Sequence, residues 1–246
     1  MRVVVAGATG LIGSRTVAGL RDHGVEVRPL SRSDGVDVVT GEGLPDALRG
    51  ADVVVDVTDA PSRAQATSVR FFEAATANLL DAAATAGAEH YVALSLVGAD
   101  RAQAGYFHAK ALQEERIRRS PIPHSIVRAT PFFESVDALS RSTAHADGVH
   151  VAPVPVRPVS THDVAATVAH VAVGLPLFGV LEVAGPEEHR LDDLTAKLLA
   201  ARGALREVVS DPRAPFFGAL LDGRTLLPVA DAHLGHESVD RWLAGR

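Results

Sequence analysis

The sequence predicts an α/β fold, a doubly wound parallel sheet with a small C-terminal lobe. Over residues 1–60, short β-branched runs alternate with stretches of helical pattern, which is typical of a parallel sheet covered by helices. Beyond residue 131 this alternation loosens, and three prolines fall within residues 149–159. We therefore expect a core over residues 1–131. Residues 132–246 would form a mixed α/β lobe that returns to the core, so that both parts make one integrated domain.

Each expected strand is a run rich in valine, isoleucine or leucine. The runs are residues 2–6, 25–30, 36–39, 52–57, 90–95, 124–128 and 180–184. The run at 36–39 is the shortest. The run at 52–57 is apolar at consecutive positions, as in a strand whose two faces are both buried.

The expected helices lie between these runs. They are residues 11–23, 44–49, 62–86, 104–119, 163–173 and 191–201. Gly24 and Gly87 follow two of them directly, where glycine readily adopts the left-handed conformation that ends a helix. Pro121 follows a third helix, and proline cannot continue the helical hydrogen-bond pattern.

Composition excludes several classes of protein. Of the 246 residues, 47% are hydrophobic and 22% are charged, values that argue against a disordered or fibrous chain. The chain has 24 Lys and Arg against 30 Asp and Glu, so its acidity argues against nucleic acid as a partner. Cysteine is absent, which excludes disulfides, thiolate zinc sites and cysteine nucleophiles. The histidines show no metal-binding spacing, and no metal is expected.

Two apolar stretches have the length of targeting or membrane segments. Residues 3–12 are broken by glycines too early for the core of a signal peptide. Residues 164–181 carry no charged side chain, but Gly174 and Pro176 interrupt them as a turn between a helix and a strand would. We therefore expect a cytoplasmic protein without a membrane partner.

A glycine-rich turn follows the first expected strand, where residues 7–13 read Gly-Ala-Thr-Gly-Leu-Ile-Gly. Gly7 can take a sharp turn, Gly10 lets the backbone approach a pyrophosphate, and Gly13 permits close packing of helix on strand. The free N–H groups at the start of the helix would face the phosphates. The pattern predicts a Rossmann-type sheet that binds a dinucleotide. The alternative is an ordinary turn rich in small residues.

The end of the second expected strand should contact the adenosine ribose, where an acidic residue indicates NAD. Here residues 30–33 read Leu-Ser-Arg-Ser. Arg32 is a planar, charged donor flanked by Ser31 and Ser33, which suits a 2′-phosphate better than a free ribose. The sequence therefore favours NADP(H). NAD(H) remains an alternative because Asp34 is adjacent, and Arg32 could also be a solvated surface residue.

Tyr106 and Lys110 lie four residues apart in an expected helix, so both side chains project from one face. An ammonium beside a phenol would lower the pKa of the phenol from about 10 toward neutrality. Such a phenol can give or take a proton at a carbonyl. Lys110 could also bind the nicotinamide ribose. The alternative for Tyr106 is a half-buried aromatic residue with a locally satisfied hydroxyl.

Two further groups are candidates for substrate contacts. Ser95 ends the strand expected at residues 90–95 and could hydrogen-bond the same substrate oxygen as Tyr106, or it could cap the local backbone. Aromatic pairs could wall an apolar substrate pocket, or they could pack in the core. These pairs are Phe132 with Phe133 and Phe216 with Phe217.

With these residues in view, the chain resembles the short-chain dehydrogenase/reductase superfamily, and within it the atypical NmrA-like, NAD(P)-binding branch. The resemblance covers nearly the whole chain. It rests on VVVAGATGLIG, FFEAATANLLDAAATAGAEHYVALSLVG, YFHAK, SIVRATPFFE, THDVAA and EVAGPEEHRLDDL. Asn78 belongs to the second of these segments, and the sequence assigns it no chemical role.

The resemblance implies roles for individual residues. The pyrophosphate would be bound by Gly7, Thr9, Gly10, Leu11, Ile12 and Gly13, the adenosine phosphate by Ser31, Arg32 and Ser33, the middle of the cofactor by Thr58, and the nicotinamide would be bordered by Pro131 and Phe132. Ser95, Tyr106 and Lys110 fall at the positions of the family's Ser-Tyr-Lys group, which implies hydride transfer at a carbonyl.

We therefore expect an NADPH-dependent oxidoreductase that reduces a small apolar or aromatic ketone, enone or quinone. Tyr106 would be the proton donor, and the C-terminal lobe would bind this small-molecule substrate. Two alternatives remain open at this point. One is a non-catalytic NADP-binding redox sensor, and the other is an isomerase, epimerase or cyclase that retains its cofactor. The sequence does not indicate an oligomeric state.

Overall fold

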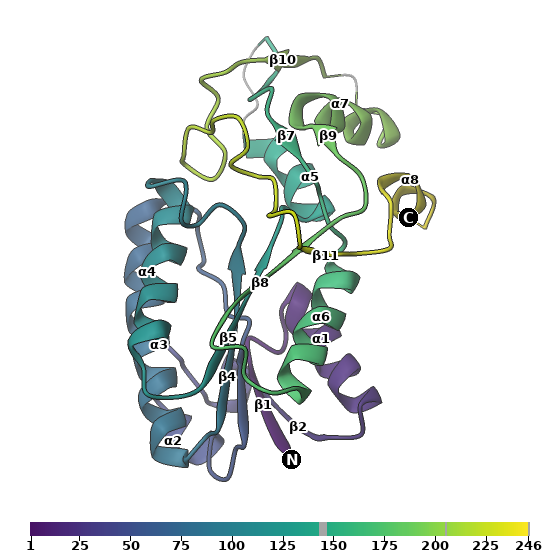
Figure 1. The fold of residues 1–246 in the computed structure, drawn as a ribbon. Helices are drawn as coiled ribbons and strands as arrows, with labels where there is room; N and C mark the ends of the chain where they lie inside the picture. Colours follow the sequence, from purple (N-terminus) through teal and green to yellow (C-terminus); the bar gives the residue numbers. More distant parts are fainter. Residues whose placement is uncertain (143–146, 205, 246) are drawn as a thin grey trace.

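The computed structural model describes residues 1–142, 147–204 and 206–245 and has a parallel sheet at its centre (Figure 1). Seven strands of the described chain form this sheet, in the order β11-β8-β5-β4-β3-β1-β2. They are β1 (Arg2–Ala6), β2 (Glu26–Leu30), β3 (Val53–Asp56), β4 (His90–Leu96), β5 (His124–Ala129), β8 (Gly179–Ala184) and β11 (His233–Leu234). All neighbouring pairs are parallel. The predicted doubly wound α/β class is confirmed, and the strand order reverses at β1, where such sheets bind ligands.

Helices cover both faces of the sheet (Figure 1). α1 (Leu11–Asp22) and α6 (Thr161–Val173) lie on one face, and α2 (Leu44–Ala47), α3 (Gln65–Ala86) and α4 (Gly105–Arg119) lie on the other. In β1, Val3 and Val5 pack toward α1 and α6, whereas Val4 packs toward α3. Strands buried on both faces read as continuous apolar runs. None of the helices in the described ranges is both long enough and apolar enough to cross a membrane.

A lobe covers the carboxyl ends of the strands (Figure 1). It contains α5 (Phe133–Ser142), β6 (Val149–Val151), β7 (Pro155–Val156), β9 (His189–Arg190), α7 (Leu191–Ala201), β10 (Val208–Ser210) and α8 (Val239–Ala244). β6 pairs with β10 and β7 with β9. The ring of Phe133 lies 5.2 Å from that of Trp242 in the core of this lobe. Between these segments the chain returns to the sheet through α6 and β8, and again through β11.

The strand predicted at residues 36–39 is wrong, because this described segment follows a short 3-10 helix (Arg32–Asp34) as an irregular turn. The carboxylate of Asp37 accepts the backbone N–H groups of Val39 at 2.7 Å and Thr40 at 3.2 Å. Local side-chain hydrogen bonds of this kind compete with strand pairing. The backbone donors that a strand would offer to a neighbour are therefore used within the turn.

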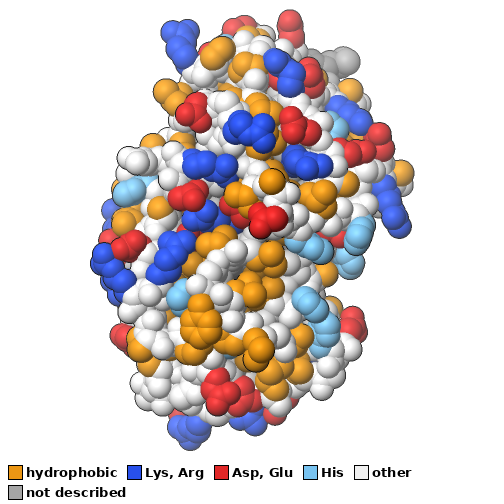
Figure 2. Space-filling view, in the orientation of Figure 1, with side chains coloured by type: hydrophobic (Ala, Val, Ile, Leu, Met, Phe, Trp, Pro, Cys, Tyr) orange, Lys and Arg blue, Asp and Glu red, His pale blue; other side chains and the backbone are white. Residues whose placement is uncertain are grey.

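One edge of the sheet is partly open. β8 pairs with β5 along most of its length, but β11 covers only Val183 and Ala184 on the other side. Figure 2 shows hydrophobic side chains gathered over the turn between α6 and β8. The exposed residues there are Leu175, Leu177, Phe178 and Val180. This apolar surface lies at the amino-terminal end of β8, away from the carboxyl ends of the strands.

Candidate functional site

A cavity of about 550 Å³ lies at the carboxyl ends of β1, β3, β4 and β5. Most of the residues predicted to bind cofactor or substrate line it. They are Gly7, Thr9, Gly10, Leu11, Ile12, Ser31, Arg32, Thr58, Ser95, Tyr106, Lys110, Pro131 and Phe132. Gly13 and Ser33, both in the described chain, lie outside this lining. The structure thus brings the glycine turn and the Tyr106–Lys110 pair into one cavity.

The glycine turn has the geometry of an anion cradle. Gly7 has a φ of +83°, and a Cβ atom there would lie 2.8 Å from the carbonyl oxygen of Val57. A Cβ atom at Gly13 would lie 2.1 Å from the carbonyl oxygen of Gly7, so Gly13 packs α1 against the turn from behind. Gly10 caps α1 without a side-chain acceptor, which leaves the first N–H groups of the helix available to an anion. These residues fit the pyrophosphate of a dinucleotide.

The opposite arm of the cavity begins at the end of β2. Ser31 Oγ lies 2.6 Å from Ser33 Oγ and donates to Asp34 Oδ2 at 2.6 Å. Arg32 is exposed, lines the cavity, and forms no ion pair or side-chain hydrogen bond with any other described residue. A guanidinium without such a partner is suited to a phosphate. The carboxylate of Asp34, held by Ser31, could instead accept a ribose hydroxyl.

Arg32 should decide between the two nicotinamide cofactors. We expect Arg32→Ala to raise the Kd of NADPH about tenfold, because one charge-assisted contact of about 1.5 kcal/mol is lost. The Kd of NADH should change less than about twofold. Fluorescence titration measures both, and Arg28→Ala, an exposed arginine on β2 outside the cavity lining, is the matched control. Equal weakening of both cofactors would contradict a phosphate contact.

Asn78, which the sequence left without a role, holds one wall of the cavity. Its side-chain amide on α3 donates to the carbonyl oxygens of Val38 at 3.0 Å and Val39 at 2.9 Å. Both of these residues line the cavity beside Ser31. A single side chain thus fixes the irregular segment that replaces the predicted strand. The signal in the sequence was a polar residue within an alanine-rich helix.

The phenol of Tyr106 does not meet an ammonium. Tyr106 is 7% exposed, and its hydroxyl donates to Asp59 Oδ1 at 2.7 Å. Burial and the negative charge of Asp59 raise the pKa of Tyr106 well above its ordinary value. The prediction of a lowered pKa is therefore wrong, because the nearest charged partner of the hydroxyl is a carboxylate. Tyr106 is a neutral phenol that donates a hydrogen bond.

Lys110 is held beneath the cavity by a chain of polar groups. Its ammonium donates to the carbonyl oxygen of Leu94 at 2.7 Å and to Gln113 Oε1. Gln113 in turn donates to Asp56 Oδ2 at 3.0 Å, and the other oxygen of Asp56 accepts the hydroxyl and N–H of Thr58. An ammonium has three donors; Leu94 and Gln113 accept two of them, and Lys110 Nζ, which lines the cavity, also lies 4.2 Å from the centre of the Phe72 ring. This series of hydrogen bonds connects Lys110, which could bind the nicotinamide ribose, to Thr58, which is predicted to contact the middle of the cofactor.

Lys110 should make cofactor binding depend on pH. Burial lowers the pKa of Lys110 to about 8, although Asp56 and Asp59 oppose this shift. The ammonium therefore predominates below pH 8 and the neutral amine above it, so a cofactor contact that uses its charge weakens as pH rises. We expect the Kd of NADPH to increase several-fold as pH rises from below the pKa of Lys110 to above it. Lys110→Met should give a flat profile, and an unchanged pH dependence in that variant would assign the effect to another group.

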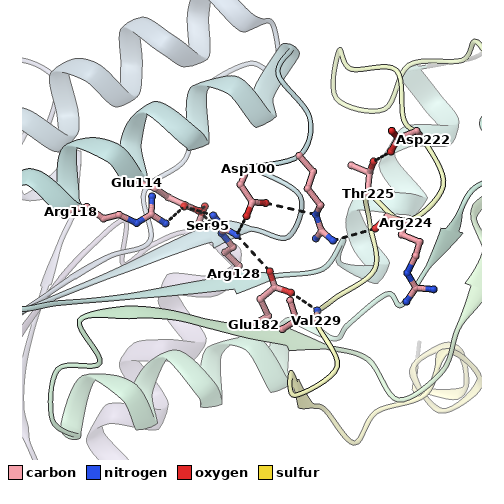
Figure 3. Close-up of polar contacts among 11 residues, drawn as sticks. Ser95, Asp100, Glu114, Arg118, Arg128, Glu182, Asp222, Arg224, Thr225 and Val229 are labelled. Atoms are coloured by element: carbon pink, nitrogen blue, oxygen red, sulfur yellow. Dashed lines mark hydrogen bonds and ion pairs between the residues drawn. The ribbon is translucent and has the colours of Figure 1, made fainter.

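Ser95 is part of a buried ionic network (Figure 3). Its hydroxyl donates to Glu114 Oε1 at 2.6 Å. Burial alone would raise the pKa of Glu114, but hydrogen bonds from Arg128 and Ser95 outweigh it and hold the pKa below its ordinary value. Because a serine hydroxyl has one hydrogen, Ser95 in this arrangement can accept from a substrate but not donate to it.

Arg128, on β5, is the centre of this network. Its guanidinium binds Glu114 at 2.7 Å and Asp100 at 2.7 Å and lies 3.7 Å from Glu182 on β8. Glu182 also accepts the N–H of Val229 at 2.8 Å. Figure 3 shows that these contacts join the sheet to the C-terminal segment that crosses over it. The network therefore fixes the lobe relative to the strands that border the cavity.

Two functional candidates were not found from the sequence. Asp59 follows β3 and Arg63 precedes α3, and both line the cavity beside Tyr106. Arg63 donates to both oxygens of Asp59, at 2.5 and 2.7 Å. Partial burial would raise the pKa of Asp59, but Arg63 outweighs it, and the pKa is lowered. The signal was an acidic and a basic residue four apart in a segment without regular structure.

Known proteins resemble this chain in sequence and in fold. A family model described as NAD(P)H-binding matches residues 7–173. The 3-diazoavenalumate denitrifying reductase of a Streptomyces species is 38% identical over 115 residues, which span 39% of this chain and 38% of that relative. An NADPH-dependent quinone oxidoreductase from Escherichia coli superposes with a TM-score of 0.65 at 17% identity, covering 99% of this chain and 98% of its own. A UDP-glucose 4-epimerase from Thermus thermophilus, in complex with NAD, gives 0.65 at 19% identity over 100% and 93%. At such identities the two solved structures show a common fold.

Proposed function

Because the chain belongs to the NAD(P)H-binding family, whose model matches residues 7–173, we propose that it is an NADPH-dependent oxidoreductase of the NmrA-like branch of short-chain dehydrogenases/reductases. Its substrate would be a small apolar or aromatic ketone, enone or quinone, with Tyr106 as the proton donor. One observation carries this proposal. A single cavity joins a phosphate cradle at one end to a neutral phenol and a buried ammonium at the other.

The cofactor would lie along the carboxyl edge of the sheet. The turn at Gly7 and Gly10 would hold the pyrophosphate, and Arg32 would hold the adenosine phosphate. Lys110 would place its remaining donor at the nicotinamide ribose. When bound there, NADPH would supply a hydride from C4 of its nicotinamide ring.

The phenol of Tyr106 would supply the proton. Its raised pKa keeps it protonated at neutral pH, which is the state that a donor needs. To reach a substrate oxygen, the hydroxyl must exchange its hydrogen bond to Asp59 for one to the substrate. The transfer leaves Tyr106 as a phenolate, which must take up a proton from solvent through the open cavity before its hydroxyl can donate to the ionised Asp59 again.

Aromatic side chains support an apolar or aromatic substrate. Phe71, Phe132 and Phe217 line the same cavity as Tyr106, and apolar walls with few polar groups are typical of small-molecule sites. The relatives support the same class of reaction, since one is named as a reductase and one as a quinone oxidoreductase.

The test is the oxidation of NADPH with a panel of quinones, enones and aromatic ketones. We expect turnover with at least one of them, and Tyr106→Phe should lower kcat for a ketone by about 100-fold or more while NADPH binding is retained. Tight NADPH binding without any turnover would favour the redox sensor instead. Conversion of a substrate without net NADPH oxidation would favour the isomerase, epimerase or cyclase.

A further inference from the structure

A planar cation is already seated in the cavity, beside the proposed proton donor. The guanidinium carbon of Arg63 lies 4.1 Å from the ring centre of Tyr106 and 5.1 Å from that of Phe217. Both terminal nitrogens of the guanidinium bind Asp59. Two aromatic faces and a carboxylate thus surround one delocalised cation, which is the arrangement that cation–π recognition uses.

The walls of this slot are fixed by the backbone. Tyr106 N–H donates to the carbonyl oxygen of Phe217 at 2.9 Å, which ties α4 to the C-terminal loop. Phe217 has a φ of +50°, and a left-handed conformation in a bulky residue is strained. At Gly105 a Cβ atom would lie 2.2 Å from the same carbonyl oxygen, so the glycine is needed for this close approach. With this strained backbone conformation, the Phe217 side chain lines the cavity.

The guanidinium of Arg63, by contrast, can be displaced at little cost. The side chains of Arg63 and Asp59 are 38% and 48% exposed, and ion pairs with such exposure contribute little to stability. Rotation about the side-chain torsions of Arg63 would move its guanidinium into solvent and leave the slot empty. An incoming planar cation would then regain the same carboxylate and the same two rings.

We infer that Asp59, Tyr106 and Phe217 form a binding slot for planar organic cations, and that Arg63 is the resident occupant which such a substrate displaces. The ligand class is an iminium ion or an N-alkylated heteroaromatic ring. An anion is disfavoured because it would face the ionised carboxylate of Asp59 and the negative faces of two rings. A neutral acceptor gains nothing from displacing Arg63 and would bind beside it.

The chemistry rests on the proposed function, and it balances without an acid. The C4–H bond of the dihydronicotinamide breaks, a C–H bond forms at the electrophilic carbon of the cation, and the π electrons of the C=N⁺ bond become a lone pair on nitrogen. The cation is reduced to a neutral amine, the dihydronicotinamide is oxidised to its cation, and no proton is taken up. Tyr106 can keep its hydrogen bond to Asp59 throughout. Its ring contacts the cation, and its hydroxyl donates no proton to the substrate.

Binding can be tested without any cofactor. The probes are N-methylacridinium, a planar fluorescent cation, and N-methylacridone, a neutral molecule of nearly the same outline. We expect Arg63→Ala to bind the cation about tenfold more tightly than the unmodified protein does, and the double variant with Asp59→Asn to lose that gain. N-methylacridone should bind all three proteins within about twofold. Tightening of both probes alike would show simple opening of apolar space and would overturn the slot.

Two further measurements keep the result independent of any damage to the fold. Methylguanidinium should compete with N-methylacridinium in Arg63→Ala, because it restores the missing occupant. Phe217→Leu in the otherwise native chain should weaken binding of the cation several-fold and leave N-methylacridone unchanged. Absence of both effects would also overturn the slot.

Turnover separates this inference from the proposed function. With NADPH present, reduction of N-methylacridinium should take up no proton, whereas reduction of a ketone takes up one per NADPH. If NADPH is not oxidised with any acceptor but the binding results hold, the proposed function fails and the slot stands. If an enone is reduced but cation binding does not respond to Arg63→Ala, the slot fails and the proposed function stands.

Discussion

Gly13→Ala is expected to raise the Kd of NADPH by about 100-fold or more, although Gly13 does not line the cavity. Its Cβ atom would lie 2.1 Å from the carbonyl oxygen of Gly7 and 2.8 Å from Ala8 Cα. Backbone atoms cannot yield as a flexible side chain does, so α1 must move away from the turn. That movement withdraws the helix N-terminus from the pyrophosphate, where several backbone N–H groups act together. Fluorescence titration with NADPH measures the loss.

Gly19→Ala is the matched control, because it introduces the same methyl group into the same helix. There the nearest atom to the new Cβ would be the Cβ of Ala169, at 3.3 Å. Side chains can adjust to this contact, and alanine favours a helix over glycine by about 1 kcal/mol. We expect near-normal NADPH binding in this variant. If Gly13→Ala also bound NADPH normally, the turn would not be the phosphate site.

Arg128→Met is expected to lower the free energy of unfolding by about 3–5 kcal/mol. Arg128 is 5% exposed and faces three carboxylates, those of Asp100, Glu114 and Glu182. Methionine fills similar space but removes the buried counter-ion of Glu114 and Glu182, so that Glu114 keeps only the half-exposed Arg118, and removing one partner is the costly way to break a buried ion pair. Urea denaturation at neutral pH measures the change.

The pH dependence provides a second check on this variant. In the native protein the pKa of Glu114 is lowered, so its ionised form contributes stability above the ordinary carboxyl pKa, and this contribution disappears as pH falls through the lowered value. The deficit of Arg128→Met should therefore shrink in acid. Arg118→Met also removes a partner of Glu114, but Arg118 is 40% exposed, and we expect a loss below about 1 kcal/mol. Equal losses in the two variants would contradict a buried network centred on Arg128.

The parts of the site that are local in sequence could be predicted from it. The glycine turn needs only a strand, three glycines and a helix in succession, and the spacing of Tyr106 and Lys110 needs only a helix. Both predictions placed residues in the cavity. The pKa of Tyr106 could not be predicted, because Asp59 approaches its hydroxyl from a loop 47 positions away in the chain. Only the packing of α4 beside the end of β3 brings these groups together.

The fold shows the same division between local and distant information. Strands with continuous valine runs were found, whereas β11 has two residues, His233 and Leu234, and exists only because β8 offers a free edge. Helix α5 was not predicted, and no element was assigned to residues 133–142. The irregular segment at residues 36–39 was mistaken for a strand, since its valines match a strand pattern while Asp37 and Asn78 use its backbone groups for a turn.

In the proposed function, one cavity brings the hydride of a bound NADPH to a substrate carbon beside Tyr106. The most direct test uses NADPH that carries deuterium at C4 of the nicotinamide, together with an enone or ketone that the protein reduces. We expect deuterium on the reduced carbon of the product, and a transfer about 100-fold or more slower in Tyr106→Phe. C4 carries two hydrogens, so NADPH is labelled at one or the other in separate experiments. NADPH oxidation that leaves no deuterium in the product in either experiment would contradict direct hydride transfer in this cavity.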